Sequence, residues 1–318
     1  MTFSVIIPTH ERRDILLGCL EHLARQTVNA ALFEVIVVAD RCTDGTAHAA
    51  THFFSSGKLS GTVVRSEGPG AAAARNRGLR EARGRIILFL DDDIYAAPDL
   101  LERHADFHRQ NPCEEFALLG FVTWHPDVRP TPFMQWMEQG GPQFAFYRLT
   151  DGQEAPWPFF YTCNVSLKRQ LLAKTSGFDE DFKQYGFEDP ELGFRLHQVG
   201  MQLFYWRSAW AHHFQRFTLQ SAARRNYNAL VSRAVFNSKP AAAALQAEGS
   251  RWKTWTDAAS MALLLPVELP FFLPLANSRI RLPRFVYRHL FRCYTAGLLL
   301  KNVLIGNRRW FLISRPPQ

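Results

Sequence analysis

Acidic residues are missing from the C-terminal part of this 318-residue sequence, because no Asp or Glu occurs between Pro270 and Gln318. The charged residues of that stretch are all basic: Arg279, Arg281, Arg284, Arg288, Arg292, Lys301, Arg308, Arg309 and Arg315. Such a block favours an anionic partner, either nucleic acid or an anionic membrane surface. No recognised nucleic-acid-binding module accompanies it, so we expect a membrane surface and no nucleic acid.

Cysteine pairs are also missing. The five cysteines are scattered and none forms a CxxC pair: Cys19, Cys42, Cys113, Cys163 and Cys293. This spacing argues against a disulfide framework and against a structural zinc site. The sequence begins directly with a strand-like run rather than a signal peptide, so we expect a reducing, cytoplasmic setting.

Short apolar runs alternate with helical patterns over the first 110 residues. Buried strands are predicted for SVIIPTH (4–10), FEVIVVAD (33–40), TVVRS (62–66) and RIILFL (85–90). Helices are predicted for residues 11–26, 47–56, 68–84 and 98–110. This alternation predicts an α/β fold with a doubly wound, mostly parallel sheet and helices on both faces. In such sheets ligands bind beyond the carboxyl ends of the strands.

Three consecutive aspartates, Asp91, Asp92 and Asp93, follow the fourth predicted strand. Burying unpaired carboxylates costs on the order of several kcal/mol each, so a positive charge is expected beside them. Asp91 and Asp93 form a DxD pattern, and Mg²⁺ is often held by a few carboxylates together with substrate phosphates. A lone DxD would be better interpreted as a strand-end turn with solvated carboxylates, but further motifs accompany this one.

Five segments together resemble the family-two glycosyltransferases, which have the GT-A fold. They are VIIPTHERRDILLGCLEHL, EVIVVADRCTDGT, GAAAARNRGLREARGRIILFLDDD, NVSLKRQLLAKTSGFDEDF and GFEDPELGFRL, and the resemblance covers residues 3–215. It implies an inverting enzyme that moves a sugar from a nucleotide-sugar, expected to be a UDP-sugar, to a lipid-linked or cell-surface glycan. It also implies a divalent metal, Mn²⁺ or Mg²⁺, as cofactor.

The resemblance also implies which residues bind the nucleotide-sugar. They are Pro8, Thr9, Glu11, Asp40, Arg75, Asp91, Asp92 and Asn164. Asp40 is the aspartate expected to hydrogen-bond the base, although Arg41 and Cys42 depart from the Gly-Ser that usually follows it. Arg75 lies near a glycine-opened helix start, where it suits a nucleotide or phosphate partner. Its alternative is a surface arginine that caps a neighbouring element.

The metal ligands implied by the resemblance are Asp91, Asp93 and one of two histidines, His212 and His213. Both histidines end a predicted strand over residues 203–214. Strand alternation places them on opposite faces, so only one can enter the site. The resemblance favours His213 for this role, while the alternative for either histidine is a purely structural one.

An inverting transfer needs a base for the acceptor hydroxyl, and a carboxylate can accept that proton. The resemblance points to GFEDPEL, with Asp189 as the base and Glu188 positioning the acceptor. The alternative is that the pair caps a helix expected to start at Pro190. Both interpretations can hold together, because a capping carboxylate can still face the site.

The predicted domains follow from these patterns. Residues 1–217 form the catalytic domain, with a nucleotide-binding half over 1–115 and an acceptor half over 116–217. Residues 218–318 form a helical, basic and apolar extension that associates with the membrane. Its most hydrophobic stretch, 258–276, contains three prolines and Glu268, which favours a kinked, re-entrant or interfacial segment over a simple spanning helix. We therefore expect peripheral or monotopic association with the inner face of the cell membrane.

Three other function classes fit less well. A nucleotidyltransferase would carry a long glycine-rich loop after the first strand, and PTHERRD has no glycine. A processive polysaccharide synthase would carry a QxxRW motif, and the nearest string, QAEGSRW, has the wrong spacing. A non-catalytic glycan- or membrane-binding homologue is disfavoured because the three aspartates, Glu188, Asp189 and a histidine are all retained.

Overall fold

The computed structural model describes residues 2–66, 68–247 and 273–304, and the chain divides into two compact units. The first unit comprises Met1–Arg129 and Phe144–Gln215, and the second comprises Pro130–Gln143 and Arg216–Gln318. The first unit therefore ends two residues before the expected boundary at 217. The segment 130–143, expected in the acceptor half, clusters with the C-terminal helices instead.

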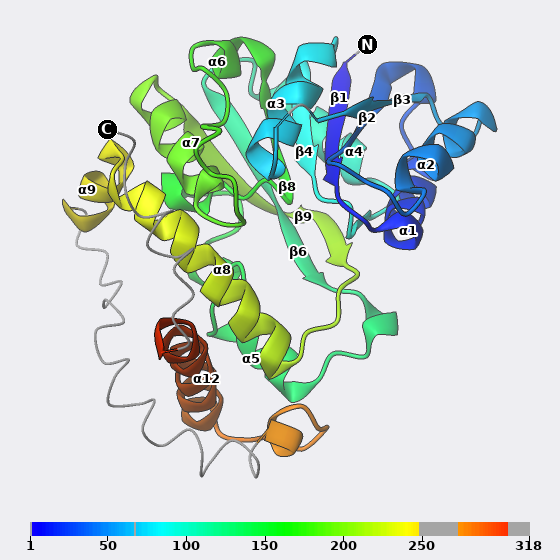
Figure 1. Cartoon of the computed structure of the whole chain (residues 1–318). Helices are drawn as coiled ribbons and strands as arrows, with labels where there is room; N and C mark the ends of the chain where they lie inside the picture. Colours follow the sequence, from blue (N-terminus) through cyan, green and yellow to red (C-terminus); the bar gives the residue numbers. More distant parts are fainter. Residues whose placement is uncertain (1, 67, 248–272, 305–318) are drawn as a thin grey trace. The chain divides into compact units, whose positions relative to one another are not determined.

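A nine-stranded sheet forms the centre of the first unit (Figure 1). Its strands are β1 (Phe3–Thr9), β2 (Phe33–Ala39), β3 (Gly61–Arg65), β4 (Ile86–Leu90), β5 (Ile94–Ala96), β6 (Phe116–Trp124), β7 (Glu154–Ala155), β8 (Asn164–Lys168) and β9 (Gln202–His213). The order is β3-β2-β1-β4-β8-β6-β9-β5, with β7 paired to β9. Strands β3, β2, β1 and β4 are parallel and the remaining part is mixed, which confirms the predicted α/β class.

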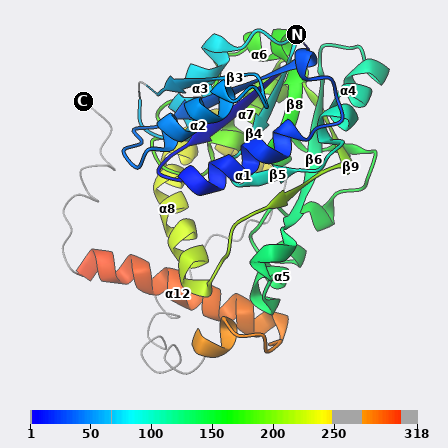
Figure 2. The same ribbon diagram turned by 90° about the vertical axis from the view of Figure 1, so that its right-hand side faces the viewer.

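Helices cover both faces of this sheet (Figures 1 and 2). They are α1 (Arg13–Ala24), α2 (Thr46–Ser55), α3 (Ala71–Glu81), α4 (Leu100–Gln110), α6 (Arg169–Ala173) and α7 (Glu188–Gln198), with short 3₁₀ turns at Ala30–Leu32, Pro126–Val128, Phe146–Arg148 and Trp157–Phe159. Helix α3 lies close to β1 and β2 because Gly78 has no side chain; a Cβ there would come within 2.5 Å of Ile6. Strand β4 is buried along its whole length, as a strand covered on both faces should be.

A tight turn connects β4 to β5 and holds the three aspartates. The Ile94 N–H donates to the Asp91 carbonyl at 3.1 Å and closes this turn. The next strand pairs antiparallel with β9, so that Ile94 lies opposite His213. The Phe214 N–H donates to the Asp93 carbonyl at 2.7 Å. These backbone contacts bring the end of β9 beside the aspartates, although the two are about 120 residues apart in the sequence.

The second unit is helical, as the C-terminal sequence predicts. Its helices are α5 (Pro132–Gln139), α8 (Leu219–Asn237), α9 (Pro240–Ala247) and α12 (Arg284–Leu304). Helix α12 packs against α8 and α5, and Trp136 and Tyr287 stack there with ring centroids 5.9 Å apart. Most of the stretch 258–276 lies outside the described residues. Among the helices that are described, none is long and apolar enough to cross a membrane.

Candidate active site

The candidate site lies where the loops after β1, β2 and β4 meet the start of α7. Three non-glycine residues in these loops have a left-handed backbone: Glu11 (φ 54°), Arg41 (φ 51°) and Phe187 (φ 71°). Such conformations cost on the order of 1–3 kcal/mol each, and they are concentrated at functional sites. The surrounding hydrogen bonds therefore hold these loops in shapes that their own backbones do not favour.

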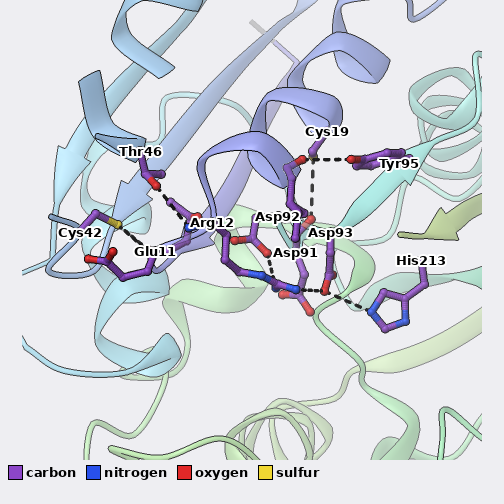
Figure 3. A network of polar contacts seen from close by, with 12 residues as sticks. Glu11, Arg12, Cys19, Cys42, Thr46, Asp91, Asp92, Asp93, Tyr95 and His213 are labelled. Carbon is purple, nitrogen blue, oxygen red and sulfur yellow. Dashed lines mark hydrogen bonds and ion pairs between the residues drawn. The ribbon is translucent and has the colours of Figure 1, made fainter. Parts of the chain in front are cut away.

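Arg12 holds two of the three aspartates (Figure 3). Its Nη1 donates to Asp92 Oδ1 at 2.7 Å, and its Nη2 donates to Asp93 Oδ2 at 2.9 Å. Thr9 Oγ1 donates to the other Asp92 oxygen at 2.7 Å. Burial and the neighbouring Asp93 charge raise the pKa of Asp92 above its ordinary value, and the contacts with Arg12 and Thr9 oppose that rise.

His213 adds a third contact to this group. Its Nε2 lies 3.2 Å from Asp93 Oδ2, and its ring stacks on Trp124 with a centroid distance of 5.2 Å. His212 lies on the opposite face of β9, beside His125 at a ring-centroid distance of 5.1 Å. The expected alternation is confirmed: the structure brings His213, and not His212, to the aspartates.

Arg75 joins the third aspartate to the GFEDPEL segment. The Nη2 of this buried arginine donates to Asp91 Oδ1 at 2.9 Å. Its Nη1 donates to Glu188 Oε1 at 3.2 Å and to Asp189 Oδ1 at 3.4 Å. Although burial opposes it, the charges of Asp189, Asp91 and Glu188 raise the pKa of Arg75 above its ordinary value. This contact set favours a role within the site over the alternative of a surface arginine.

Asp189 is held by hydrogen bonds from Thr162 in a largely buried position, and burial raises its pKa. Thr162 donates to it twice, from its N–H at 3.1 Å and from its Oγ1 at 2.8 Å. Burial raises the pKa of Asp189 to about 7, and Arg75 opposes that rise. The side chain keeps 21% of its surface exposed, so solvent or a substrate can still reach it.

The helix after this motif begins earlier than predicted. Helix α7 starts at Glu188 rather than Pro190, so both carboxylates lie within its first turn. Neither side chain caps the helix from outside, and Phe187 at the N-cap position makes no side-chain cap hydrogen bond. Glu188 Oε2 instead accepts from the Gly186 N–H at 2.9 Å. The capping alternative is therefore wrong, although the carboxylates still complement the positive end of the helix.

The residues expected beside the nucleoside lie at the other end of the site. Asp40 accepts from the Gly70 N–H at 2.9 Å, at the start of α3, and from Arg41 Nε at 2.9 Å. Glu11 Oε1 accepts from the Thr43 N–H at 2.6 Å. Pro8 lies in β1 opposite Val38 of β2. These contacts connect the loops after β1 and β2 to the start of α3.

Asn164 lies opposite Leu90, next to the aspartates, where β8 pairs with β4, but its side chain makes its contacts elsewhere. Its side chain is fully buried, with Oδ1 accepting from His104 Nε2 at 3.0 Å. Its Nδ2 donates to the backbone carbonyls of Ala209 at 3.0 Å and Phe121 at 3.3 Å, across a register shift between β6 and β9. The amide is thus used within the sheet, on the face covered by α4.

The donor set fits a metal only in part. Among the described residues, no three His, Cys, Asp or Glu side chains are placed to hold one ion. Asp93 and His213 form a carboxylate–imidazole pair 3.2 Å apart, a ligand chemistry that Mn²⁺ accepts. Asp91 points instead toward Arg75. The protein therefore offers two ligands, and the remaining positions suit phosphate oxygens.

Two residues that hold the carboxylates of the site were not predicted from the sequence. Arg12 meets the requirement for a positive charge beside the aspartates, and the only sequence signal was its place just after the first strand, in PTHERRD. Thr162 holds Asp189 from 27 positions away in the sequence, and no local pattern marks it.

The family model described as Glycosyl transferase family 2 matches residues 4–175, and the model described as the N-terminal domain of galactosyltransferase matches residues 151–219. The chain is similar to a validoxylamine A glucosyltransferase of Streptomyces hygroscopicus subsp. jinggangensis, with 30% identity over 255 residues. That match covers 74% of this chain and 58% of the relative, so the chain spans about three fifths of the relative's length.

A second relative is known from sequence and structure. The poly(ribitol-phosphate) β-N-acetylglucosaminyltransferase TarS of Staphylococcus aureus is 33% identical over 34% of this chain and 19% of its own. A solved structure of TarS with UDP is 19% identical to this chain, with a TM-score of 0.54 over 95% of this chain and 92% of that one. The structure of a mannosyltransferase from Pyrobaculum calidifontis, solved with GDP-Man and Mn²⁺, matches this chain with a TM-score of 0.60 at 21% identity. The match covers 96% of this chain and 87% of the mannosyltransferase. These two likenesses show the shared fold.

Proposed function

The chain belongs to glycosyl transferase family 2, and we propose that it transfers a sugar from a nucleotide-sugar to an acceptor hydroxyl with inversion. One observation supports this proposal most strongly: Arg75 joins Asp91, at the end of β4, to Glu188 and Asp189, at the start of α7. One aspartate of the proposed donor site and the two carboxylates proposed for the acceptor thus share one arginine, and a direct displacement needs the two substrates to be this close.

Asp189 is the proposed general base. It accepts the proton of the acceptor hydroxyl while that oxygen attacks the anomeric carbon, and the bond to the diphosphate breaks on the opposite side. A base with a pKa near the working pH serves this purpose best, and burial raises the pKa of Asp189 to about 7. Thr162 orients the carboxylate by two hydrogen bonds. Glu188 is proposed to position the acceptor.

The donor is proposed to lie along the loops after β1, β2 and β4, with its base near Asp40 and Glu11. Asp93 and His213 would hold a divalent metal together with the donor phosphates, and Asp91 is a proposed additional ligand if Arg75 releases it. A metal bound there would supply Lewis-acid stabilisation of the diphosphate leaving group. We propose a UDP-sugar as donor, because the similar protein TarS was solved with UDP.

The acceptor is proposed to be a lipid-linked glycan or a hydroxyl-rich polymer of the cell envelope. The name of TarS gives poly(ribitol-phosphate) as the polymer that this relative modifies, which supports an acceptor of that class. The charge of the chain agrees with it: the formal net charge is +8, which attracts a polyanionic acceptor or an anionic surface.

A nucleotide panel tests the donor assignment. Thermal unfolding of the full chain is measured with UDP, GDP, dTDP and CDP, each with and without Mn²⁺. A nucleotide present at a hundredfold excess over its Kd should stabilise the protein by about 2.7 kcal/mol, which raises Tm by several degrees. We expect this rise with UDP, larger with Mn²⁺ than without. If no nucleotide raises Tm under either condition, the transfer function is contradicted.

We also propose that the second unit binds an anionic bilayer, on the inner face of the cell membrane. Four arginines and two large apolar side chains are exposed around the start of α12, and they form what we term the basic patch: Arg279, Ile280, Arg281, Arg284, Phe285 and Arg288. Phe285 is 72% exposed and Ile280 is 56% exposed. Exposed apolar side chains among arginines are the composition of helices that lie in a membrane interface.

Vesicle sedimentation tests this surface. Each arginine near an anionic membrane contributes about 1 kcal/mol, so replacing both Arg284 and Arg288 by Gln should weaken binding to phosphatidylglycerol vesicles roughly thirtyfold. The exposed Arg224 of α8 gives a matched control, and Arg224→Gln should leave binding within about threefold. Equal binding of the unaltered protein to purely zwitterionic vesicles, or equal binding of the double variant, would contradict the proposal.

A further inference from the structure

Arg12 is placed as a clamp on the aspartates rather than as an ordinary surface arginine. Its two terminal nitrogens bind two different carboxylates, at 2.7 Å on Asp92 and 2.9 Å on Asp93, and both carboxylates are buried (Figure 3). A guanidinium suits this arrangement because its donors form a rigid planar fork. One point charge, such as an ammonium, cannot reproduce the same pair of directed contacts.

The backbone of Arg12 is fixed, so only the side chain can change position. The Arg12 N–H donates to Thr46 Oγ1 at 3.3 Å, and its carbonyl accepts from the Leu16 N–H at 2.9 Å at the start of α1. The side chain keeps 29% of its surface exposed, whereas those of Asp92 and Asp93 keep 5% and 6%. A rotation about its side-chain bonds can therefore carry the guanidinium away while the aspartates stay in place.

The clamp competes directly with the pair that suits a cation. The oxygen of Asp93 that accepts from Arg12 is the same oxygen that faces His213: Oδ2 lies 2.9 Å from Arg12 Nη2 and 3.2 Å from His213 Nε2. A divalent cation that binds this oxygen competes with the guanidinium, because two positive charges held a few ångströms apart repel each other.

A diphosphate offers Arg12 an alternative partner. Guanidinium groups bind phosphate oxygens by the same charge-assisted, forked contacts that they make with carboxylates. The donor's phosphates would therefore release Asp93 from Arg12 at the moment when the cation arrives. Binding of either ligand would favour binding of the other, as thermodynamic linkage requires.

We propose that Arg12 is a gate on the cation site: it holds Asp92 and Asp93 in the free protein and releases them to the cation only when a nucleoside diphosphate is bound. This inference rests on the proposed function, because it takes a diphosphate as the ligand that releases the gate. In this proposal Arg12 couples metal binding to donor binding, so that the metal binds weakly to the free protein and tightly when the nucleotide is bound.

The test measures Mn²⁺ binding to the full chain by electron paramagnetic resonance of free Mn²⁺, first without nucleotide. Three variants are compared with the unaltered protein: Arg12→Lys, Arg12→Gln and Arg13→Gln. Arg13 is the exposed neighbour, paired with Asp14 at 2.9 Å outside the site, so Arg13→Gln is the matched control. Circular dichroism verifies that each variant is folded.

We expect Arg12→Lys to bind Mn²⁺ alone about tenfold more tightly than the unaltered protein, within the usual range of coupling factors. Arg12→Gln should bind at least as tightly, and Arg13→Gln should remain within about twofold. Arg12→Lys is decisive because it keeps the positive charge and removes the fork. If only Arg12→Gln binds Mn²⁺ more tightly, general charge repulsion explains the result and the proposed gate is overturned. If Arg12→Gln does not fold, the Mn²⁺ affinity of Arg12→Lys alone tests the proposal.

Repeating the titration with UDP present measures the coupling itself. The gain in Mn²⁺ affinity produced by UDP should be about tenfold smaller in Arg12→Lys than in the unaltered protein. An equal gain in both proteins overturns the gate. Failure of the proposed function would be distinct, because UDP would then bind neither protein, with or without Mn²⁺, while the effect of Arg12 on Mn²⁺ alone is still measured.

Discussion

Asp189→Asn is expected to lower turnover by about a thousandfold, the middle of the range for loss of a general base. The amide cannot accept the acceptor proton, yet it matches the carboxylate in size and keeps an oxygen for Thr162. Nucleotide binding should change little, because the residue lies on the side of Arg75 that we propose for the acceptor. The measurement is kcat with a UDP-sugar and a hydroxyl acceptor, together with the Kd for UDP.

The pH dependence of turnover is a second test of Asp189 as the general base. The base acts only when it is deprotonated, and burial raises the pKa of Asp189 to about 7. Turnover should therefore rise with pH and level off above about 7, and Asp189→Asn should lose this rise. Glu191→Gln is the matched control, since Glu191 lies in the same helical turn but binds Arg195 at 2.7 Å. A kcat for Asp189→Asn within tenfold of the unaltered enzyme contradicts the assignment of the base.

Arg75→Gln is expected to lower the free energy of unfolding by about 3 kcal/mol, as when one partner is removed from a buried ion pair. The buried Glu188 and the partly exposed Asp91 and Asp189 would then keep negative charge without the guanidinium that neutralises it. The deficit should shrink as the pH is lowered, because protonation removes that charge. Urea denaturation at several pH values measures it.

A control on the same helix separates this effect from a loss of helix stability. Arg77 is only partly buried and pairs with Glu81 one turn later, so Arg77→Gln should cost no more than about 0.5 kcal/mol. Adding Asp91→Asn to Arg75→Gln should recover part of the loss, since the double variant removes one unpaired charge. Equal losses for Arg75→Gln and Arg77→Gln would show that the ion cluster contributes no stability.

Much of the sheet in the first unit could be predicted from the sequence. Strands β1, β2, β3 and β4 agree with the sequence expectation within one or two residues, because each is a short apolar run bounded by polar turns. Convergence of the loops after β1, β2 and β4 followed from the parallel order alone. Strand alternation, a local property of β9, predicted that only one of His212 and His213 can enter the site, and the resemblance favoured His213.

Other features depended on contacts between distant segments. Local patterns did not indicate that 130–143 clusters with the C-terminal helices, or that Asn164 is used inside the sheet. The early start of α7 depends on the left-handed backbone at Phe187, and a sequence pattern favours glycine for such a position.

Local sequence patterns were enough to predict the alternation of strands and helices and the acidic turn after β4, because short-range periodicity and turn residues encode both. The identity of the charges that neutralise the three aspartates depended on tertiary contacts. Arg12 lies 80 residues from Asp92, and Arg75, which is only 16 residues from Asp91, also meets Glu188 from a distance of 113 residues. Buried carboxylates require opposite charge, but that requirement does not state which arginine meets it. The fold selects the partner, because only chain packing brings those particular charges to between 2.7 and 3.4 Å of one another.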